Sequence, residues 1–337
     1  MFELLSANLV QIMSFVTFSF VVGILLTPLF TDFLYRNRLG KKIRRTDYAG
    51  NKAPIYTKLH KSKENTPTMG GLIIWVPAAV LTIIFNLSRA GTWLPLFSLV
   101  SSGVVGGVDD LLNISGVGPN RGGMRFRYKL LLHVGMAAVG AWWFFVKLGW
   151  SIIHIPMLGN FEIGFWYVPI FILVIVFFAF AVNETDGLDG LAGGTLAIAY
   201  GAYAVIALSQ GKVELAIFCA TILGMTLSFL WFNIYPARFF MGDTGAMALG
   251  MTLGVVAFLT NTVPLLFIIG IVFVAEACSA ILQIISKKFF KKKIFLSAPI
   301  HHHFEALGWP ETKITMRFWI IAAIAATLGL TLALFEK

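Results

Sequence analysis

The chain has 337 residues, of which 58% are hydrophobic and only 12% are charged, and its mean hydropathy is +0.83. A soluble domain needs more charge than this to cover its surface, so a soluble globular protein is excluded. The net charge of +10 does not call for a nucleic acid, and we expect no nucleic-acid partner, because the orientation of a membrane protein accounts for most of it.

The apolar residues form long blocks that alternate with short polar links. A helix needs about 20 mainly apolar residues to cross roughly 30 Å of hydrocarbon. We therefore predict an all-α, polytopic integral membrane protein with about ten transmembrane helices, forming a single domain over residues 1–337. The predicted spans are 12–34, 70–88, 93–111, 129–147, 165–182, 191–209, 213–232, 245–260, 263–286 and 316–335. The polar break 148–164 contains proline and glycines and is predicted to fold as a small hairpin.

The basic residues predict the orientation of these spans. All but four of the 26 Lys and Arg residues fall on one side, in or beside the links at 35–69, 110–128, 183–190, 233–244 and 287–315. The four exceptions are Arg89, Lys147, Lys212 and Lys337. Because cytoplasmic loops carry an excess of Lys and Arg, we predict that these links are cytoplasmic and that both termini lie outside.

Three residues inside predicted spans carry reactive or polar groups. Cys219 and Cys278 are expected to be buried thiols that serve packing. Glu276 lies in the middle of the ninth predicted span, where an ionised carboxylate is costly. We therefore predict that Glu276 is neutral or paired with a polar neighbour.

Two acidic motifs lie at the predicted cytoplasmic side. Asp109 and Asp110 lie at the end of the third predicted span. Adjacent carboxylates at a membrane surface repel each other, so a divalent cation or a proton is expected to offset their charge. A solvated helix end is the alternative. The link 183–190 reads NETDGLDG and has three acids and no base. The spacing of Asn183, Asp186 and Asp189 would place them on one side of a helical turn; a turn with solvated caps is the alternative.

Two further motifs stand where predicted spans begin. Asp243, within FFMGDTG, is predicted to be a metal ligand, a helix N-cap or both. Lys63 and the motif TPTMGG at 66–71 bring a lysine, hydroxyls and free backbone amides to a helix start, which suits an anion. An ordinary capped helix start is the alternative.

The last link holds three consecutive histidines, His301, His302 and His303. They cannot all face one metal from a regular helix or strand, so a zinc site is not expected. Phosphate binding or proton transfer is favoured, because histidine titrates near neutral pH, and a solvated histidine run is the alternative.

These motifs lie on five different links that share one predicted membrane face. Acids for a divalent cation, basic residues at the rim and histidines describe a site for phosphate-containing substrates. Mg²⁺ suits such a site best, because it prefers hard oxygen ligands and shares polyphosphates. The alternative to an enzyme is a transporter of a lipid-linked substrate. A transporter would place its polar residues near the midplane of the membrane, whereas these motifs lie at one face.

In this order the motifs resemble those of the polyprenyl-phosphate N-acetylhexosamine-1-phosphate transferases, and within that superfamily the phospho-N-acetylmuramoyl-pentapeptide transferases. The matching motifs are TPTMGG at 66–71, DD at 109–110, NETDGLDGL at 183–191, FMGDTG at 240–245 and APIHHHFE at 298–305. The resemblance covers residues 60–310 or so and implies the ten-helix architecture, with both termini outside, that the charges predict independently.

The resemblance implies a reaction and a place for it. Phospho-MurNAc-pentapeptide would pass from UDP-MurNAc-pentapeptide to undecaprenyl phosphate, with Mg²⁺, giving lipid I and UMP for peptidoglycan synthesis. The site would lie on the cytoplasmic face of the bacterial plasma (inner) membrane, in a homodimer surrounded by membrane lipids. A UDP-GlcNAc:polyprenyl-phosphate GlcNAc-1-phosphate transferase is the nearest alternative enzyme.

The resemblance also assigns roles by motif position. Asp243 would bind Mg²⁺, with Asp109 and Asp110 beside it as further candidate ligands and one of them as base or nucleophile. The remaining residues of the implied catalytic set are His301, His302 and His303, which would contact phosphates or sugar. The implied substrate-binding residues are Lys63, Thr68, Arg127, Lys129, Asn183, Asp186, Asp189, Asn233, Phe240 and Gln283, with Phe240 stacking on uracil.

One departure from the family's pattern bears on these roles. The family often reads DDxxK, but here the fifth position is Asn113, so a lysine role there is absent or passes to Arg125 or Arg127. Direct attack by the lipid phosphate and a covalent aspartyl-phosphate route both remain open, and direct attack is favoured because a lipid phosphate is already largely ionised at neutral pH.

Overall fold

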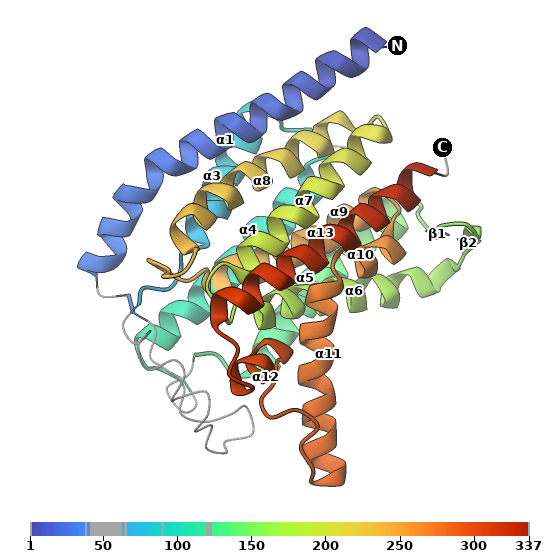
Figure 1. Cartoon of the computed structure of the whole chain (residues 1–337). Coiled ribbons are helices and arrows are strands. Elements are labelled where there is room, and N and C mark those ends of the chain that lie inside the picture. The colour runs from blue at the N-terminus through green and yellow to red at the C-terminus, as the bar shows by residue number, and fades with distance from the viewer. Residues whose placement is uncertain are drawn as a thin grey trace.

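A computed structural model describes residues 2–37, 39–40, 63, 66–88, 91–118 and 123–335 of the chain. Most of the basic link predicted at 35–69 lies outside the described residues, and so does Arg121. The described part is a bundle of long helices with one small hairpin, as Figure 1 shows.

Long apolar helices account for most of the described chain. Eight of them are long and apolar enough to cross a membrane, which confirms the predicted all-α, polytopic membrane fold. They are α1 (Phe2–Arg36), α4 (Trp93–Ile114), α5 (Phe126–Trp142), α6 (Tyr167–Thr185), α7 (Leu191–Ser209), α8 (Val213–Asn233), α9 (Gly242–Leu259) and α13 (Glu311–Phe335). A π-helical turn, Trp143–Lys147, extends α5.

Two of the ten predicted spans differ from the described structure. The span predicted at 70–88 is the shorter helix α3 (Leu72–Phe85), of 14 residues. The span predicted at 263–286 is wrong as a single helix, because it consists of α10 (Val263–Ile269) and α11 (Ile271–Ile285), joined at a bend of 83°. Gly270 lies at the break, where a Cβ atom would stand only 2.8 Å from the Leu266 carbonyl oxygen, so a residue without a side chain fits this bend.

The bend directs α11 away from the rest of the bundle (Figure 1). A second π-helical turn, Ser286–Phe290, continues it. Cys278 is therefore exposed on α11, contrary to the prediction, whereas Cys219 is buried in α8 as expected.

The polar break after α5 forms the predicted hairpin. Its strands, β1 (Ile152–Ile155) and β2 (Gly159–Glu162), pair antiparallel with Ile152 opposite Glu162. A short 3₁₀ turn, Gly164–Trp166, leads into α6. In Figure 1 the hairpin and both chain ends lie at one end of the bundle, and the short helix α12 (Ile300–Ala306) lies at the other.

Helix α9 is the centre of the bundle, and almost all of its residues are buried. Glycines let its N-terminal end approach α3 and α4 closely. A Cβ at Gly71 would lie 2.2 Å from the Gly245 Cα, and a Cβ at Gly106 would lie 2.4 Å from the Asp243 carbonyl oxygen. Small residues at helix contacts are typical of membrane bundles, and here they bring Asp243 next to the end of α4.

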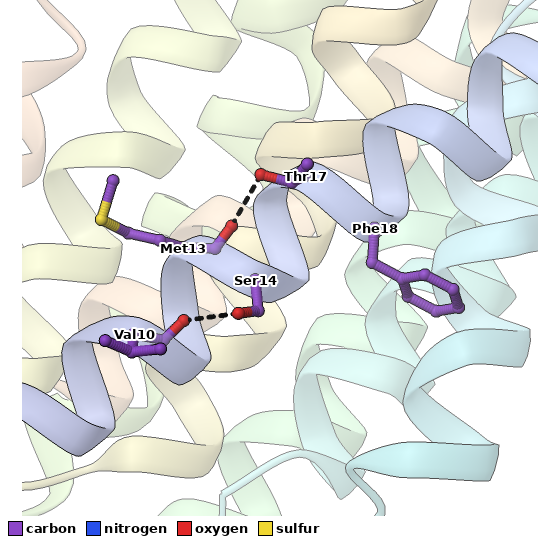
Figure 2. A pocket seen from close by; sticks show the side chains of 5 residues that line it. All are labelled: Val10, Met13, Ser14, Thr17 and Phe18. Carbon is purple, nitrogen blue, oxygen red and sulfur yellow. Dashed lines mark hydrogen bonds between the residues drawn. The ribbon is translucent and has the colours of Figure 1, made fainter.

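The outer face of α1 has a surface hollow of about 570 Å³, lined by Val10, Met13, Ser14, Thr17 and Phe18. Figure 2 shows that its two hydroxyls bond within the helix, from Ser14 to the Val10 carbonyl and from Thr17 to the Met13 carbonyl. These bonds satisfy the polar groups and leave an apolar surface, so this hollow suits hydrocarbon rather than a phosphate.

Candidate active site

Side chains from four helices converge where α4 ends and α9 begins. Asp109 of α4 and Asp243 of α9 both form ion pairs with the ammonium of Lys129 on α5. Asn183 of α6 donates a hydrogen bond from Nδ2 to Asp243 Oδ1 at 2.9 Å. We call Asp109, Lys129, Asn183 and Asp243 the acidic centre. It joins three separately predicted motifs to one basic residue.

The first amides of α9 are satisfied by carboxylates from other elements. The Gly242 amide donates to Asp186 Oδ2 at 2.9 Å, and the Thr244 amide donates to Asp110 Oδ2 at 3.0 Å. Helix N-terminal amides lack partners within their own helix and attract negative charge. Asp243 is not the N-cap residue, which is Met241, so the reading of Asp243 as a simple cap is wrong.

The link 183–190 continues α6 only as far as Thr185. The helix ends at Thr185, so the prediction that Asn183, Asp186 and Asp189 share one helical face is wrong. Each goes to a different partner, and Asp189 accepts a hydrogen bond from the Ala237 amide at 2.9 Å. The glycines of the link allow the chain to turn, with Gly190 at a φ of 76°.

Lys63 anchors a second group of charges beside Phe240. Its Nζ lies 2.7 Å from Asp189 Oδ1, 2.5 Å from Glu311 Oε1 and 5.7 Å from the centre of the Phe240 ring. Burial disfavours the charged ammonium, but the two carboxylates outweigh it and raise the pKa of Lys63 above its usual value.

Glu311 belongs to this group of charges, and no sequence motif pointed to it. It is the first residue of α13, and its carboxylate also accepts the Asp189 amide at 2.5 Å. The only signal for it was an acid in a mainly basic link, because the last predicted span began further along the chain.

Asn233 and the TPTMGG motif connect the link 183–190 and the FMGDTG segment through hydrogen bonds to backbone groups. Asn233 accepts from the Gly190 amide at 3.0 Å and donates to the Phe239 carbonyl at 2.8 Å. The Gly70 and Gly71 amides donate to the carbonyls of Phe240 and Met241, both at 2.8 Å. The prediction that these two amides are free to bind an anion is therefore wrong, because they pair with the FMGDTG segment.

Thr68 is held by this pairing next to the start of α9. Its hydroxyl is buried and has no hydrogen-bond partner within the described structure. A Cβ at Gly242 would lie 2.7 Å from Thr68 Oγ1 and 2.6 Å from Asp110 Oδ2, so Thr68 and Asp110 both border the turn that precedes Asp243.

The three histidines lie on α12, and His301 and His302 are buried, so the reading of the motif as a solvated run is wrong for these two. His301 Nδ1 lies 2.9 Å from Glu276 Oε2, and His302 Nδ1 lies 2.6 Å from Glu305 Oε2. His303 Nδ1 accepts from the Leu296 amide. Glu276 is thus paired with a polar neighbour, as predicted.

Two residues of the implied substrate-binding set make other contacts. Arg127 is exposed, and its guanidinium lies 4.9 Å from the centre of the neighbouring Tyr128 ring. Gln283 accepts from the amides of Ile294 and Phe295 at 3.0 and 3.1 Å, and it donates to the Phe295 carbonyl. These bonds hold the loop after α11 rather than joining Gln283 to the acidic centre.

The sequence matches known proteins over most of its length. A glycosyl transferase family 4 profile matches residues 92–261, and a phospho-N-acetylmuramoyl-pentapeptide-transferase signature matches residues 63–74. The chain is 41% identical over 330 residues to the phospho-N-acetylmuramoyl-pentapeptide-transferase of Chloroflexus aurantiacus, covering 94% of this chain and 88% of that protein. It is 41% identical over 318 residues to that of a Geobacillus species and 38% identical over 320 residues to that of Bacillus mycoides, covering 93% of this chain and 94% of the relative in both cases.

The chain belongs to the phospho-N-acetylmuramoyl-pentapeptide transferase family. It is therefore a multi-pass membrane enzyme that transfers a sugar phosphate. The signature of the transferase family contains Lys63, Thr68 and the two glycines that pair with the FMGDTG segment. The broader profile contains the whole acidic centre.

Asp109 and Asp243 are the described residues that could bind a metal ion for phosphate transfer. Among the described residues no three His, Cys, Asp or Glu side chains are grouped to hold a metal ion by themselves. Mg²⁺ is usually held by one or two carboxylates together with substrate phosphates, and not by a cage of protein ligands. Asp109 and Asp243, which both reach the Lys129 ammonium, present hard oxygen ligands to one point, so this donor set fits Mg²⁺.

Proposed function

We propose that this protein transfers phospho-MurNAc-pentapeptide from UDP-MurNAc-pentapeptide to undecaprenyl phosphate, forming lipid I and releasing UMP. The observation that carries the proposal is the convergence of Asp109, Lys129, Asn183 and Asp243 at one end of the bundle. Family membership supports the choice of substrates. The basic residues of the same side support a site on the cytoplasmic face of the bacterial plasma (inner) membrane.

The nucleoside of the substrate binds at the group around Lys63. Phe240 stacks on uracil, and Lys63 lies over the same ring, held by Asp189 and Glu311. The buried Thr68 hydroxyl, which has no partner in the described structure, is available to the bound nucleotide. Asn233 shapes this pocket through the hydrogen bonds of its side chain to the backbone of Gly190 and Phe239.

The diphosphate binds at the acidic centre. Asp243, with Asp109 beside it, would hold Mg²⁺, which when bound would supply positive charge to the diphosphate and to the departing UMP. Lys129 supplies a fixed positive charge beside the two carboxylates, and Asn183 orients the Asp243 carboxylate. The exposed Arg127 and the other basic residues of the rim attract the anionic substrates.

Of the two adjacent aspartates, Asp109 is the better placed base. Asp110 holds the Thr244 amide at the start of α9, so its carboxylate keeps that helix in place. Asp109 accepts the Met124 amide through Oδ1, but its Oδ2 faces the Lys129 ammonium, beside Asp243. In the direct route Asp109 orients the lipid phosphate, which attacks the sugar-linked phosphorus while UMP leaves.

The test is release of labelled UMP by the protein purified in detergent, with UDP-MurNAc-pentapeptide and undecaprenyl phosphate as substrates. We expect release that requires Mg²⁺ and is lost in Asp243→Ala. Asp32→Ala is the matched control, because Asp32 is exposed and pairs only with Arg36 on α1 among its described contacts. Turnover of UDP-GlcNAc in place of the muramoyl substrate would show the alternative transferase, and no release by folded protein would contradict an enzyme.

A further inference from the structure

Among the ion pairs of the described residues, the pair of Glu276 and His301 is the most deeply buried. Both side chains are fully buried. Glu276 Oε2 lies 2.9 Å from His301 Nδ1 and 3.4 Å from the His301 backbone amide, which belongs to the first turn of α12. One carboxylate oxygen therefore fixes both the ring and its backbone.

This contact leaves two polar atoms without partners. Glu276 Oε1 and His301 Nε2 are buried, and neither has a hydrogen-bond partner in the described structure. A buried polar atom without a partner is costly and needs an explanation, such as a partner that arrives later. Because Nδ1 is committed to Glu276, Nε2 is the ring nitrogen left for another group.

The surroundings of Nε2 belong to the candidate active site. A Cβ at Gly187 would lie 2.2 Å from Nε2, so only a glycine allows the ring to lie at this place. Gly187 follows Asp186, which holds the amide of Gly242, the residue before Asp243. The imidazole thus lies directly against the link that supports the start of α9.

The fold brings Glu276 to this place through the bend at Gly270. Glu276 lies on α11, the half of the broken span that departs from the bundle by 83°. His302, by contrast, pairs with Glu305 three residues further on within α12. Glu276 therefore ties the histidine helix to a membrane helix, whereas Glu305 does not.

The charges favour an imidazolium at His301. Burial alone would lower the pKa of His301, but the Glu276 carboxylate outweighs it, helped by Glu305 and Glu184, and raises that pKa. A charged ring bonded to Glu276 through Nδ1 presents an N–H at Nε2, and such a donor suits an anionic phosphate oxygen.

We propose that Glu276 is a positioning residue for His301: it holds the ring through Nδ1 so that Nε2 donates to an anionic oxygen of the phosphate-bearing substrate. The proposal rests on the function proposed above. It adds a buried membrane carboxylate to the residues on which turnover depends. Glu276 itself acts only through His301.

Kinetics of a double-mutant cycle test this. We expect Glu276→Gln, which keeps the shape but removes the charge, to lower kcat about 10- to 100-fold, the range for a lost hydrogen bond between charged groups. The inhibition constant of UMP should stay unchanged, because the pocket around Lys63 is not altered. In a His301→Asn background the same substitution should change kcat less than about threefold. Glu162→Gln is the control, since Glu162 is exposed on β2 at the other end of the bundle.

Nitrogen NMR of the wild-type protein with ¹⁵N-labelled histidine gives a second, independent measurement. With His301→Asn used to assign the signals, we expect protons on both Nδ1 and Nε2 of His301. A neutral ring protonated at only one of the two nitrogens would overturn the proposal, and this measurement applies even where Glu276→Gln does not fold. Wild-type turnover in folded Glu276→Gln, or equal losses in both backgrounds, would also overturn it. If the wild-type protein itself releases no UMP, the proposed function fails, and the NMR result still reports on the pair.

Discussion

Lys129 reaches two carboxylates at once, and this contact sets the electrostatics of the acidic centre. Asp109 and Asp243 come from different helices, and Lys129 is about nine-tenths buried. Removing the cation would leave two carboxylates with like charge and little water around them. A divalent cation bound by these two carboxylates would therefore offset the same negative charge that the Lys129 ammonium offsets.

Lys129→Met should make stability depend on the metal. Loss of one partner of a buried ion pair costs about 3–5 kcal/mol, so we expect a lower thermal unfolding temperature in detergent. Mg²⁺ should raise that temperature more in the variant than in the wild-type protein, because it replaces the missing charge. Lys147→Met is the control, since Lys147 is exposed further along the same membrane helix. An equal response to Mg²⁺ in all three proteins would contradict this role.

The pair of His301 and Glu276 should make stability depend on pH. The pKa of His301 in the folded protein lies above its ordinary value of 6.5. Its stabilising contribution is therefore fully present below about pH 6.5 and is lost as the pH rises through the folded-state pKa. We expect the difference in unfolding temperature between wild type and His301→Asn to be largest near pH 6 and to shrink towards pH 9. A difference that grows with pH would show the opposite shift.

At the scale of elements, the candidate active site depends on how closely α3 and α4 approach the start of α9. Gly71 and Gly106 leave no room for a side chain against the backbone of Gly245 and Asp243. The TPTMGG segment also pairs with the FMGDTG segment through its amides. Backbone contact at these positions fixes where Asp243 points.

Gly71→Ala should disturb this contact. The added Cβ would lie 2.2 Å from the Gly245 Cα, and backbone atoms cannot move aside cheaply. We expect a loss of about 1–3 kcal/mol in the free energy of unfolding, together with reduced UMP release. Gly135→Ala on α5 is the matched control, because a Cβ there meets nothing within 4 Å. Equal stability of the two variants would show that the α3–α9 contact is looser than described.

On the scale of the whole molecule, the structure separates two ends. The hairpin and both chain ends lie at one end of the bundle, and α12 lies at the other (Figure 1). The distribution of Lys and Arg predicts that the α12 end is cytoplasmic.

Single cysteines would test this orientation in a background of Cys219→Ala and Cys278→Ala. We expect an impermeant maleimide added to intact cells to label Leu158→Cys, in the exposed turn of the hairpin. Lys291→Cys, beyond α11, should react only after the membrane is permeabilised. The reverse pattern would place the candidate active site outside.

Sequence reasoning succeeded where the signal is local. Hydropathy gave nearly all of the spans, because a stretch of apolar residues must leave water wherever its neighbours lie. Proline and glycine predicted the hairpin, and the cost of an isolated carboxylate in a membrane predicted a partner for Glu276. The motifs named most residues that the structure gathers around Asp243, and the family resemblance added Lys129.

Only the tertiary structure decided which of these residues meet. Glu276 pairs with His301, 25 positions away along the chain, because the span bends at Gly270, and no composition window distinguishes a bent helix from a straight one. Glu311 joins Lys63 across 248 positions. The sequence determined that charged groups would lie at one face, since charge avoids hydrocarbon. Which carboxylate faces which cation depends on contacts between helices that lie far apart in the chain.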